Sequence, residues 1–351
     1  MKNSTLPSAL VACLAITLPA HAHHSFTEYD FQHPIEIEGT LRDVMWQNPH
    51  VRFKLQSVDK NGRAVMWDIE SNSVSILRRT DVKQEDLKAG NKVKVFGGPS
   101  RRSSQRFFAN NVLLQNGQEL VLNPDEKKPH WTTAASGLKT TWTEGGTVAN
   151  SNVTLFHVWG SKFGDPQMTS PGEMWRKDYP LTQAARKVLS AWNPVTDTVT
   201  PGCKAKGMPT IMDQPYPVEF IDKGDVILFR MEEHDTVRTI HMKGSVDVEK
   251  QPKTLLGYST GRWEGKTLVV TTSRIGWQHF DKDGVPLGAA AKFVERFTPS
   301  VDGSRLNYEI TVTDPETFTE PVEMKGVWVW RPGEQVSPYN CTTSKLASPK
   351  S

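Results

Sequence analysis

The chain has 351 residues, with 42 Lys and Arg against 39 Asp and Glu and a formal net charge of +3. This near balance argues against a nucleic-acid-binding protein, and 37% hydrophobic residues with 11 Trp argue against general disorder. The length suggests two domains, and 25 Gly with 23 Pro favour short strands and turns over long helices.

The first 22 residues have the features of a secretory signal peptide. Lys2 gives a positive start, residues 10–18 form a short apolar stretch, and Ala20-His21-Ala22 fits the small-x-small cleavage rule. The apolar stretch is too short for a membrane span, so we expect a periplasmic or secreted protein with no transmembrane segment in the mature chain. The alternatives are a buried N-terminal helix and a lipoprotein cleaved before Cys13.

Residues 23–123 are predicted to form a small β-barrel domain. Phe53 and Leu55 alternate with polar residues, which is the period of a half-buried strand. Asn61-Gly62 predicts a hairpin turn, and residues 73–79 predict a short helix. We expect about six strands here, and an OB-like barrel is the simplest arrangement because closure removes exposed sheet edges.

Residues 124–200 are predicted to be a Trp-rich linker with one helix at 181–192 and a strand at 152–159, and its Trp side chains are expected to pack on the domains. Thr182 is expected to cap the start of the helix, with Ala184, Val188, Leu189 and Trp192 on one side of it. Residues 201–341 show recurring strand and turn signals, which indicate an antiparallel barrel or sandwich of eight strands. Such a barrel can enclose one small ligand. Residues 342–351 are expected to be a flexible tail. The expected strands are 218–221, 226–232, 237–242, 255–263, 267–272, 292–299, 305–313 and 322–330.

Cys203 and Cys341 are the two cysteines that follow the expected signal peptide. In an exported protein we predict that they form a disulfide, which would join the start of the second domain to its end. The alternative is a pair of buried thiols.

Three histidines suggest a metal site at the start of the mature chain. If cleavage follows Ala22, the chain begins with His23 and His24. An N-terminal His offers its amine and an imidazole nitrogen to one metal ion, and a nitrogen of His50 completes a set suited to copper(II). The alternative is a solvated chain end.

Two motifs carry a resemblance to a known family. His-His-Ser-Phe at residues 23–26 and Trp-Gln-Asn-Pro-His at 46–50 resemble the motifs of a family of small exported bacterial domains of unknown function. The resemblance covers residues 23–122, so it implies export and a domain boundary but supplies no activity.

The second half, residues 201–341, also resembles an uncharacterised bacterial family. The resemblance rests on motifs such as Arg238-Thr239-Ile240-His241-Met242 and Gly261-Arg262-Trp263-Glu264-Gly265. It implies a lipocalin-like all-β fold and transfers no catalytic residue.

A predicted hairpin carries Arg230, Glu232, His234, Arg238 and His241. Strand alternation would place the first three of them on one face. If that face points into a barrel, Glu232 with either histidine can act as an acid/base pair, while the arginines hold an anionic or carbonyl group. If it points outward, the same side chains form a salt-bridged surface.

The sequence thus predicts an exported, mainly β protein, in which a small OB-like barrel is followed by a larger antiparallel lipocalin-like barrel or sandwich, with a short helix in the linker. We expect the second barrel to bind a small, partly apolar molecule. The alternatives are an enzyme of lyase, isomerase or hydrolase type and a copper-binding protein; no other cofactor and no nucleic-acid partner is indicated. The candidate ligand-binding residues are Arg230, Arg238, Tyr258 and Trp263. Asp281 and Glu295 are weaker candidates for the acid/base chemistry, and the alternative for Asp281 is an ordinary role in a turn at residues 280–284.

Overall fold

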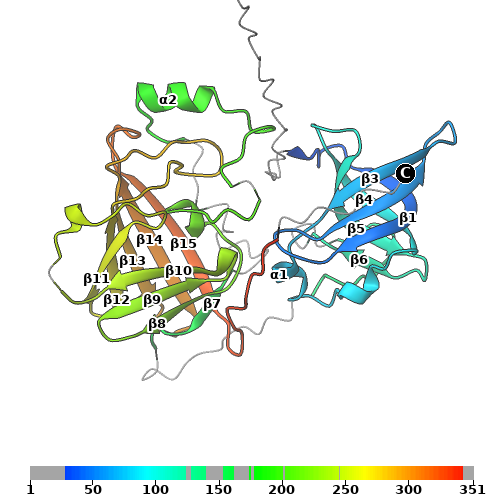
Figure 1. Cartoon of the computed structure of the whole chain (residues 1–351). Coiled ribbons are helices and arrows are strands. Elements are labelled where there is room, and N and C mark those ends of the chain that lie inside the picture. The colour runs from blue at the N-terminus through cyan, green and yellow to red at the C-terminus, as the bar shows by residue number, and fades with distance from the viewer. Residues whose placement is uncertain are drawn as a thin grey trace, which may run out of the picture.

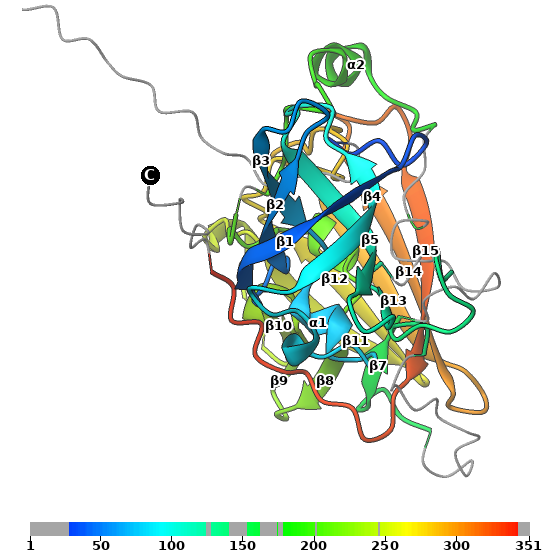
Figure 2. The ribbon, with the colours of Figure 1, turned by 90° about the vertical axis from the view of Figure 1, so that its right-hand side faces the viewer.

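The computed structural model describes residues 28–123, 128–139, 153–161, 174, 178–200, 202–244 and 246–342. These residues form two β-barrels that lie side by side, as Figures 1 and 2 show. A C-terminal strap, residues 331–342, leaves the larger barrel and runs along the smaller one. The predicted fold class, a small OB-like barrel followed by a larger β-barrel, is confirmed.

The N-terminal barrel has the strand order β3-β2-β1-β4-β5-β6, and a parallel pairing of β3 with β5 closes its first five strands. The helix α1 connects β3 to β4, where a short helix was expected. The Ser73 hydroxyl accepts the backbone N–H of Ile76 and so caps α1. The elements of this barrel are β1 (Ile35–Met45), β2 (Arg52–Val58), β3 (Ala64–Glu70), α1 (Val74–Leu77), the 3-10 turn Gln84–Asp86, β4 (Lys92–Pro99), β5 (Arg106–Leu114) and β6 (Glu119–Val121).

Alternating apolar residues fill this small barrel as their spacing predicted. Phe53 and Leu55 are fully buried, and Phe107 of β5 packs in the same core. Phe108, the next residue of β5, is also buried. The expected turn at Asn61-Gly62 is present, with a positive φ of 78° at the glycine.

The C-terminal barrel closes in the order β10-β11-β12-β13-β14-β15-β7-β8-β9. All eight expected strands are present, and a ninth, β7, overlaps the end of the strand expected at 152–159 in the linker. The barrel is not antiparallel throughout, because β10 and β11 pair in parallel. Its strands are β7 (Val158–Gly160), β8 (Val218–Asp222), β9 (Val226–Met231), β10 (Thr236–His241), β11 (Tyr258–Glu264), β12 (Thr267–Ser273), β13 (Lys292–Pro299), β14 (Arg305–Thr313) and β15 (Val322–Trp330), and its 3-10 turns are Thr210–Met212, Glu233–Asp235 and Val248–Lys250.

The helix α2 (Gln183–Ser190) lies beyond one end of this barrel (Figure 1). Thr182 is its N-cap as predicted, since its hydroxyl accepts the backbone N–H of Ala185 at 3.1 Å. The expectation that Ala184 and Val188 lie on the buried side of this helix is wrong. Ala184 is exposed and Val188 is 54% exposed, whereas the buried residue of the helix is Ala185.

Side chains fill the interior of the C-terminal barrel. Phe220 and Phe229 stack with ring centroids 4.1 Å apart, and Phe297 packs against both rings. Tyr308 and Trp328 continue this aromatic cluster, with centroids 5.2 Å apart. These rings pack in the interior of the barrel, where a ligand was expected.

Candidate functional site

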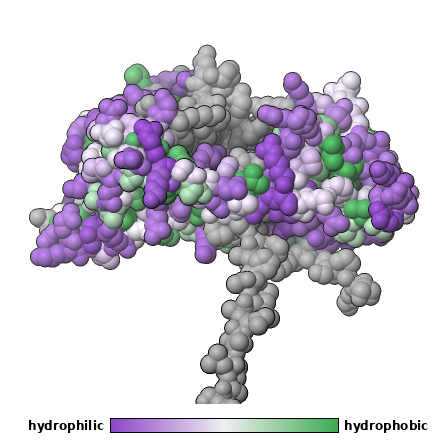
Figure 3. All heavy atoms as spheres, turned by 90° about the horizontal axis from the view of Figure 1, so that it is seen from above, coloured by the Kyte–Doolittle hydropathy of each residue, from purple (hydrophilic) through white to green (hydrophobic). Residues whose placement is uncertain are grey.

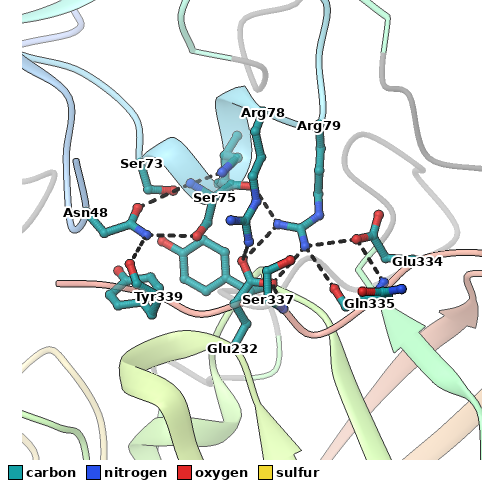
Figure 4. A network of polar contacts seen from close by, with 12 residues as sticks. Asn48, Ser73, Ser75, Arg78, Arg79, Glu232, Glu334, Gln335, Ser337 and Tyr339 are labelled. Carbon is teal, nitrogen blue, oxygen red and sulfur yellow. Dashed lines mark hydrogen bonds and ion pairs between the residues drawn. The ribbon is translucent and has the colours of Figure 1, made fainter. Parts of the chain in front are cut away.

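Glu232 does not lie on a strand face with Arg230 and His234, as strand alternation had predicted. β9 ends at Met231, and the chain turns at Glu233–Asp235 with a positive φ of 56° at His234. This turn breaks the period of two. Glu232 is fully buried in an ion-paired network between the two barrels (Figure 4).

Two arginines of the N-terminal barrel neutralise the Glu232 carboxylate. Arg79 donates to both of its oxygens, at 2.9 and 2.7 Å, and Arg78 donates to Oε1 at 2.5 Å. Arg79 also contacts Glu334 of the strap at 3.0 Å, and the backbone N–H of Ser337 donates to Glu232. The carboxylate expected to be a catalytic acid or base therefore joins the two barrels and the strap.

The Trp-x-Asn-Pro-His element also contacts the strap. The Asn48 side chain donates to the carbonyl oxygen of Tyr339 at 2.5 Å and to the Ser75 hydroxyl at 3.0 Å. Its backbone carbonyl accepts the N–H of Thr342 at 3.1 Å. Figure 4 shows Asn48 and Ser75 facing Tyr339 across this junction. In this chain the asparagine of the motif therefore positions the strap.

The predicted disulfide between Cys203 and Cys341 is present, with Cα atoms 5.7 Å apart. It fastens the strap to the segment that precedes β8. The backbone of Cys341 also forms a parallel bridge with Asn48, so one residue of the strap is held by both barrels.

The two candidate catalytic histidines lie at opposite ends of the β9–β10 hairpin. His234 is in the turn, where burial lowers its pKa and its ring meets that of Tyr339 with centroids 5.2 Å apart. His241 pairs with Val226 at the other end of the hairpin and stacks on Tyr258 at 4.5 Å. β10 spans about 17 Å between these ends, so Glu232 and His241 are not brought together.

The candidate ligand-binding residues are also dispersed. Arg230 points outward and pairs with Glu219 at 2.5 Å, while Trp263 is 44% exposed near the end of β11. Arg238 lies inside the barrel, 1% exposed, rather than on a solvated face. Neither these residues nor Tyr258 line the pocket described below.

Arg238 belongs to a satisfied polar cluster in the barrel core. It is ion-paired with Glu295 through both carboxylate oxygens and donates to Ser259 at 3.0 Å and Thr272 at 2.5 Å. The Tyr308 hydroxyl donates to Glu295 at 3.0 Å. Burial opposes the charge of Arg238, but the Glu295 carboxylate raises its pKa overall. This cluster holds the sheet together across the interior.

A pocket of about 760 Å³ opens at the end of the C-terminal barrel where α2 lies. Its walls come from α2 and the loop after it, from the loop before β11, from the loop between β12 and β13, and from the loop between β14 and β15. The lining residues are Val188, Ala191, Trp192, Asp197, Lys253, Ile275, Gly276, Trp277, Gln278, His279, Gly284, Pro286, Leu287, Gly288, Ala289 and Glu316. Its volume is in the range of small-molecule sites.

Three rings form the main walls of this rim pocket. Trp277 meets His279 with centroids 5.2 Å apart at an angle of 70°, and Trp192 meets it at 6.3 Å and 60°. The Trp277 indole donates to the Thr210 hydroxyl at 2.9 Å. Trp192 packs closely on Gly284, where an added Cβ would lie 2.3 Å from the indole. Both indoles are therefore fixed before any guest enters.

The charged side chains of the rim pocket are few. The Lys253 ammonium donates to the carbonyl oxygen of Ala289 at 2.9 Å. The Asp197 carboxylate accepts the backbone N–H of Asn193 at 2.9 Å. Burial lowers the pKa of His279 below its ordinary 6.5, which favours the neutral ring. The walls thus combine apolar rings with a small number of polar groups.

Asp281 supports the loop that carries His279. It is 2% exposed, and its Oδ1 accepts the backbone N–H groups of Asp283 at 2.9 Å and Val285 at 3.0 Å. Burial raises the pKa of this carboxyl to about 6. Asp281 therefore stabilises a turn through its side chain, as the sequence of residues 280–284 indicated.

Asp281→Asn is expected to remove a pH dependence of stability. Because the folded pKa of about 6 lies above the ordinary 3.8, the stabilising contribution of the protonated carboxyl is complete below pH 3.8 and is lost as the pH rises through about 6. The difference between the two values corresponds to about 3 kcal/mol. Asparagine keeps the Oδ1 acceptor without ionising, so its free energy of unfolding should vary less across this range.

Urea unfolding at several pH values measures this difference. Glu320→Gln, which removes an exposed carboxylate, serves as the control and should retain the profile of the unaltered protein. Parallel stability profiles for Asp281→Asn and the unaltered protein would contradict the assignment.

His23 and His24, the first two candidate copper ligands, lie outside the described residues. The third, His50, is part-buried; its Nδ1 lies 2.8 Å from the carbonyl oxygen of Ser71 and 3.5 Å from a carboxylate oxygen of Glu70. Among the residues that the structure describes, no group of three or more His, Cys, Asp or Glu side chains is arranged to hold a metal ion.

Comparison with known proteins assigns no activity. Residues 10–108 match the model of a family of unknown function, DUF6152. The match agrees with the resemblance of the first domain to an uncharacterised family and covers less than a third of the chain. No curated protein matches the sequence. Of the helices in the described ranges, none has the length and apolarity of a membrane span.

The sequence did not single out the residues of the rim pocket as a site. Trp192 was interpreted as part of a helix face, and Trp277 and His279 belong to a loop without a catalytic or ligand motif. The nearest signal is the aromatic run Trp277-Gln278-His279-Phe280 directly after Gly276. Such a run in a loop indicates a partly exposed aromatic surface.

Proposed function

We propose that the protein binds a small, partly apolar molecule in the rim pocket of its C-terminal barrel. The observation that carries the proposal is the set of three rings, Trp192, Trp277 and His279, around an open volume of about 760 Å³. A guest that covers these rings removes apolar surface from water without requiring them to rearrange.

The surface around the pocket supports a small guest rather than a broad partner. Figure 3 views the molecule from the side of α2, and its hydrophobic residues form separate small spots among hydrophilic ones. A protein-docking surface usually has a continuous apolar core, whereas apolar side chains gathered inside a pocket favour a small molecule.

Binding is preferred to acid/base catalysis because of what the proposed catalytic residues already contact. Glu232 is paired with Arg78 and Arg79, and His241 lies at the other end of its hairpin. An acid/base pair needs its members within hydrogen-bonding reach of one substrate.

We further propose that this binding occurs outside the cytoplasm. The Cys203–Cys341 disulfide supports the proposal, since such bonds persist in oxidising compartments. The signal-like features of residues 1–22 support it independently.

Trp192→Ala is expected to weaken binding of the guest at least about tenfold, because the substitution removes one of the aromatic walls. A thermal-shift screen of partly apolar metabolites on the full chain identifies binders, and calorimetry then gives the dissociation constants. Trp263→Ala is the matched control, since Trp263 is 44% exposed and lies outside the pocket.

A screen without a binder would contradict the proposal. Equal affinities for the Trp192→Ala and Trp263→Ala variants would contradict it as well, because binding would then lie elsewhere on the protein.

A further inference from the structure

We propose that the guest of the rim pocket is a small organic cation, such as one that carries a quaternary ammonium group. This inference rests on the proposed function and deepens it by naming the ligand class. It is carried by two separate features of the pocket, the arrangement of its rings and the balance of its charges.

The rings stand around the pocket as walls rather than as one flat surface. Trp192 and Trp277 both meet the His279 ring at steep angles, 60° and 70°. The face of an indole is the strongest natural partner for a desolvated cation, and several rings at an angle can contact an ammonium group from more than one side. Hydrogen bonding of Trp277 to Thr210 and packing of Trp192 on Gly284 hold the two indoles in place.

The charges of the pocket favour the same ligand. Glu316 and Asp197 contribute two carboxylates, and Lys253 contributes one ammonium. The Lys253 ammonium is directed to the carbonyl oxygen of Ala289. Among the described residues the Glu316 carboxylate has no ion-pair or hydrogen-bond partner, so it is available to a guest.

The surroundings of His279 agree with this argument. The ring is part-buried and meets both indoles, and burial disfavours its charged form. In its neutral form the imidazole adds a third ring without adding positive charge, and the two carboxylates of the lining outnumber its one ammonium.

Three phenols of one shape test the ligand class on the full-length protein. They carry in the para position a trimethylammonium group, a tert-butyl group or a sulfonate, so the charge changes while the size is nearly constant. We expect the trimethylammonium phenol to bind roughly 3- to 30-fold more tightly than the tert-butyl phenol. Indole N–H signals in NMR spectra and calorimetry give the affinities.

Two charge variants give effects of opposite sign. Glu316→Gln should weaken binding of the cation by about two- to fivefold, and Lys253→Met should strengthen it by a similar factor. Both variants should change binding of the tert-butyl phenol less than binding of the cation, whereas Trp192→Ala should weaken all three compounds.

The outcomes separate this inference from the proposed function. If the tert-butyl phenol or the sulfonate binds as well as the cation, and Trp192→Ala still abolishes binding, the ligand class is wrong and the binding site stands. If none of the three compounds binds, the ligand class is wrong, and the metabolite screen then decides separately whether the pocket binds another guest.

Discussion

Replacing Glu232 by alanine is expected to lower the free energy of unfolding by about 3–5 kcal/mol, the usual cost of breaking a buried ion pair. The loss is large because Arg79 is 4% exposed and keeps its charge without the carboxylate that Glu232 now supplies. Glu334 remains beside Arg79 at 3.0 Å and offsets part of the loss. The backbone N–H of Ser337 would also lose its acceptor, which loosens the strap.

Urea unfolding followed by fluorescence measures this effect. Glu219→Ala is the matched control, because Glu219 forms a part-exposed pair with Arg230 and its removal should cost only about 0–1 kcal/mol. Equal, small effects of the two substitutions would show that the carboxylate of Glu232 does not hold the barrels together. They would also reopen the acid/base role that the sequence suggested for it.

The strands were predictable because a half-buried strand exposes one face and buries the other. Phe53 and Leu55 are fully buried as their alternation indicated, and the strand Lys292–Pro299 has the bounds expected from the sequence. The short strand Val158–Gly160 has only three residues. A strand was expected at 152–159, but three residues are too few to show which sheet a strand joins, so its place in the barrel was not predicted.

The surroundings of the charged residues were less predictable, since their partners are distant in the sequence. Arg238 pairs with Glu295 across the barrel, and Glu232 pairs with Arg79 of the other barrel. The pattern of neighbouring residues reveals neither of these distant partners. Charged groups without a partner are normally exposed, so exposure was expected for Arg238 and Glu232. The turn at His234 added a second error, because a strand that stops at Met231 no longer alternates.

The rim pocket depends on the fold in the same way. Trp192 follows α2, whereas Trp277 and His279 lie in the loop after β12, and only closure of the barrel brings these segments together. The expectation that the Trp-rich linker packs on the domains is confirmed for Trp159, which is fully buried in the core of the larger barrel. Trp142 and Trp175 lie outside the described residues.

Replacing both Cys203 and Cys341 by serine is expected to cost about 4–5 kcal/mol if loop entropy dominates, because the bond closes a loop of 138 residues. We expect this loss of stability to be greatest at the junction between the barrels, because the backbone of Cys341 also forms a bridge with Asn48. A reducing agent should bring the unaltered protein to the stability of the double-serine variant and leave that variant unchanged. If chemical unfolding is the same with and without the bond, the strap is held by its hydrogen bonds to Asn48 and Glu232, and the disulfide adds nothing to them.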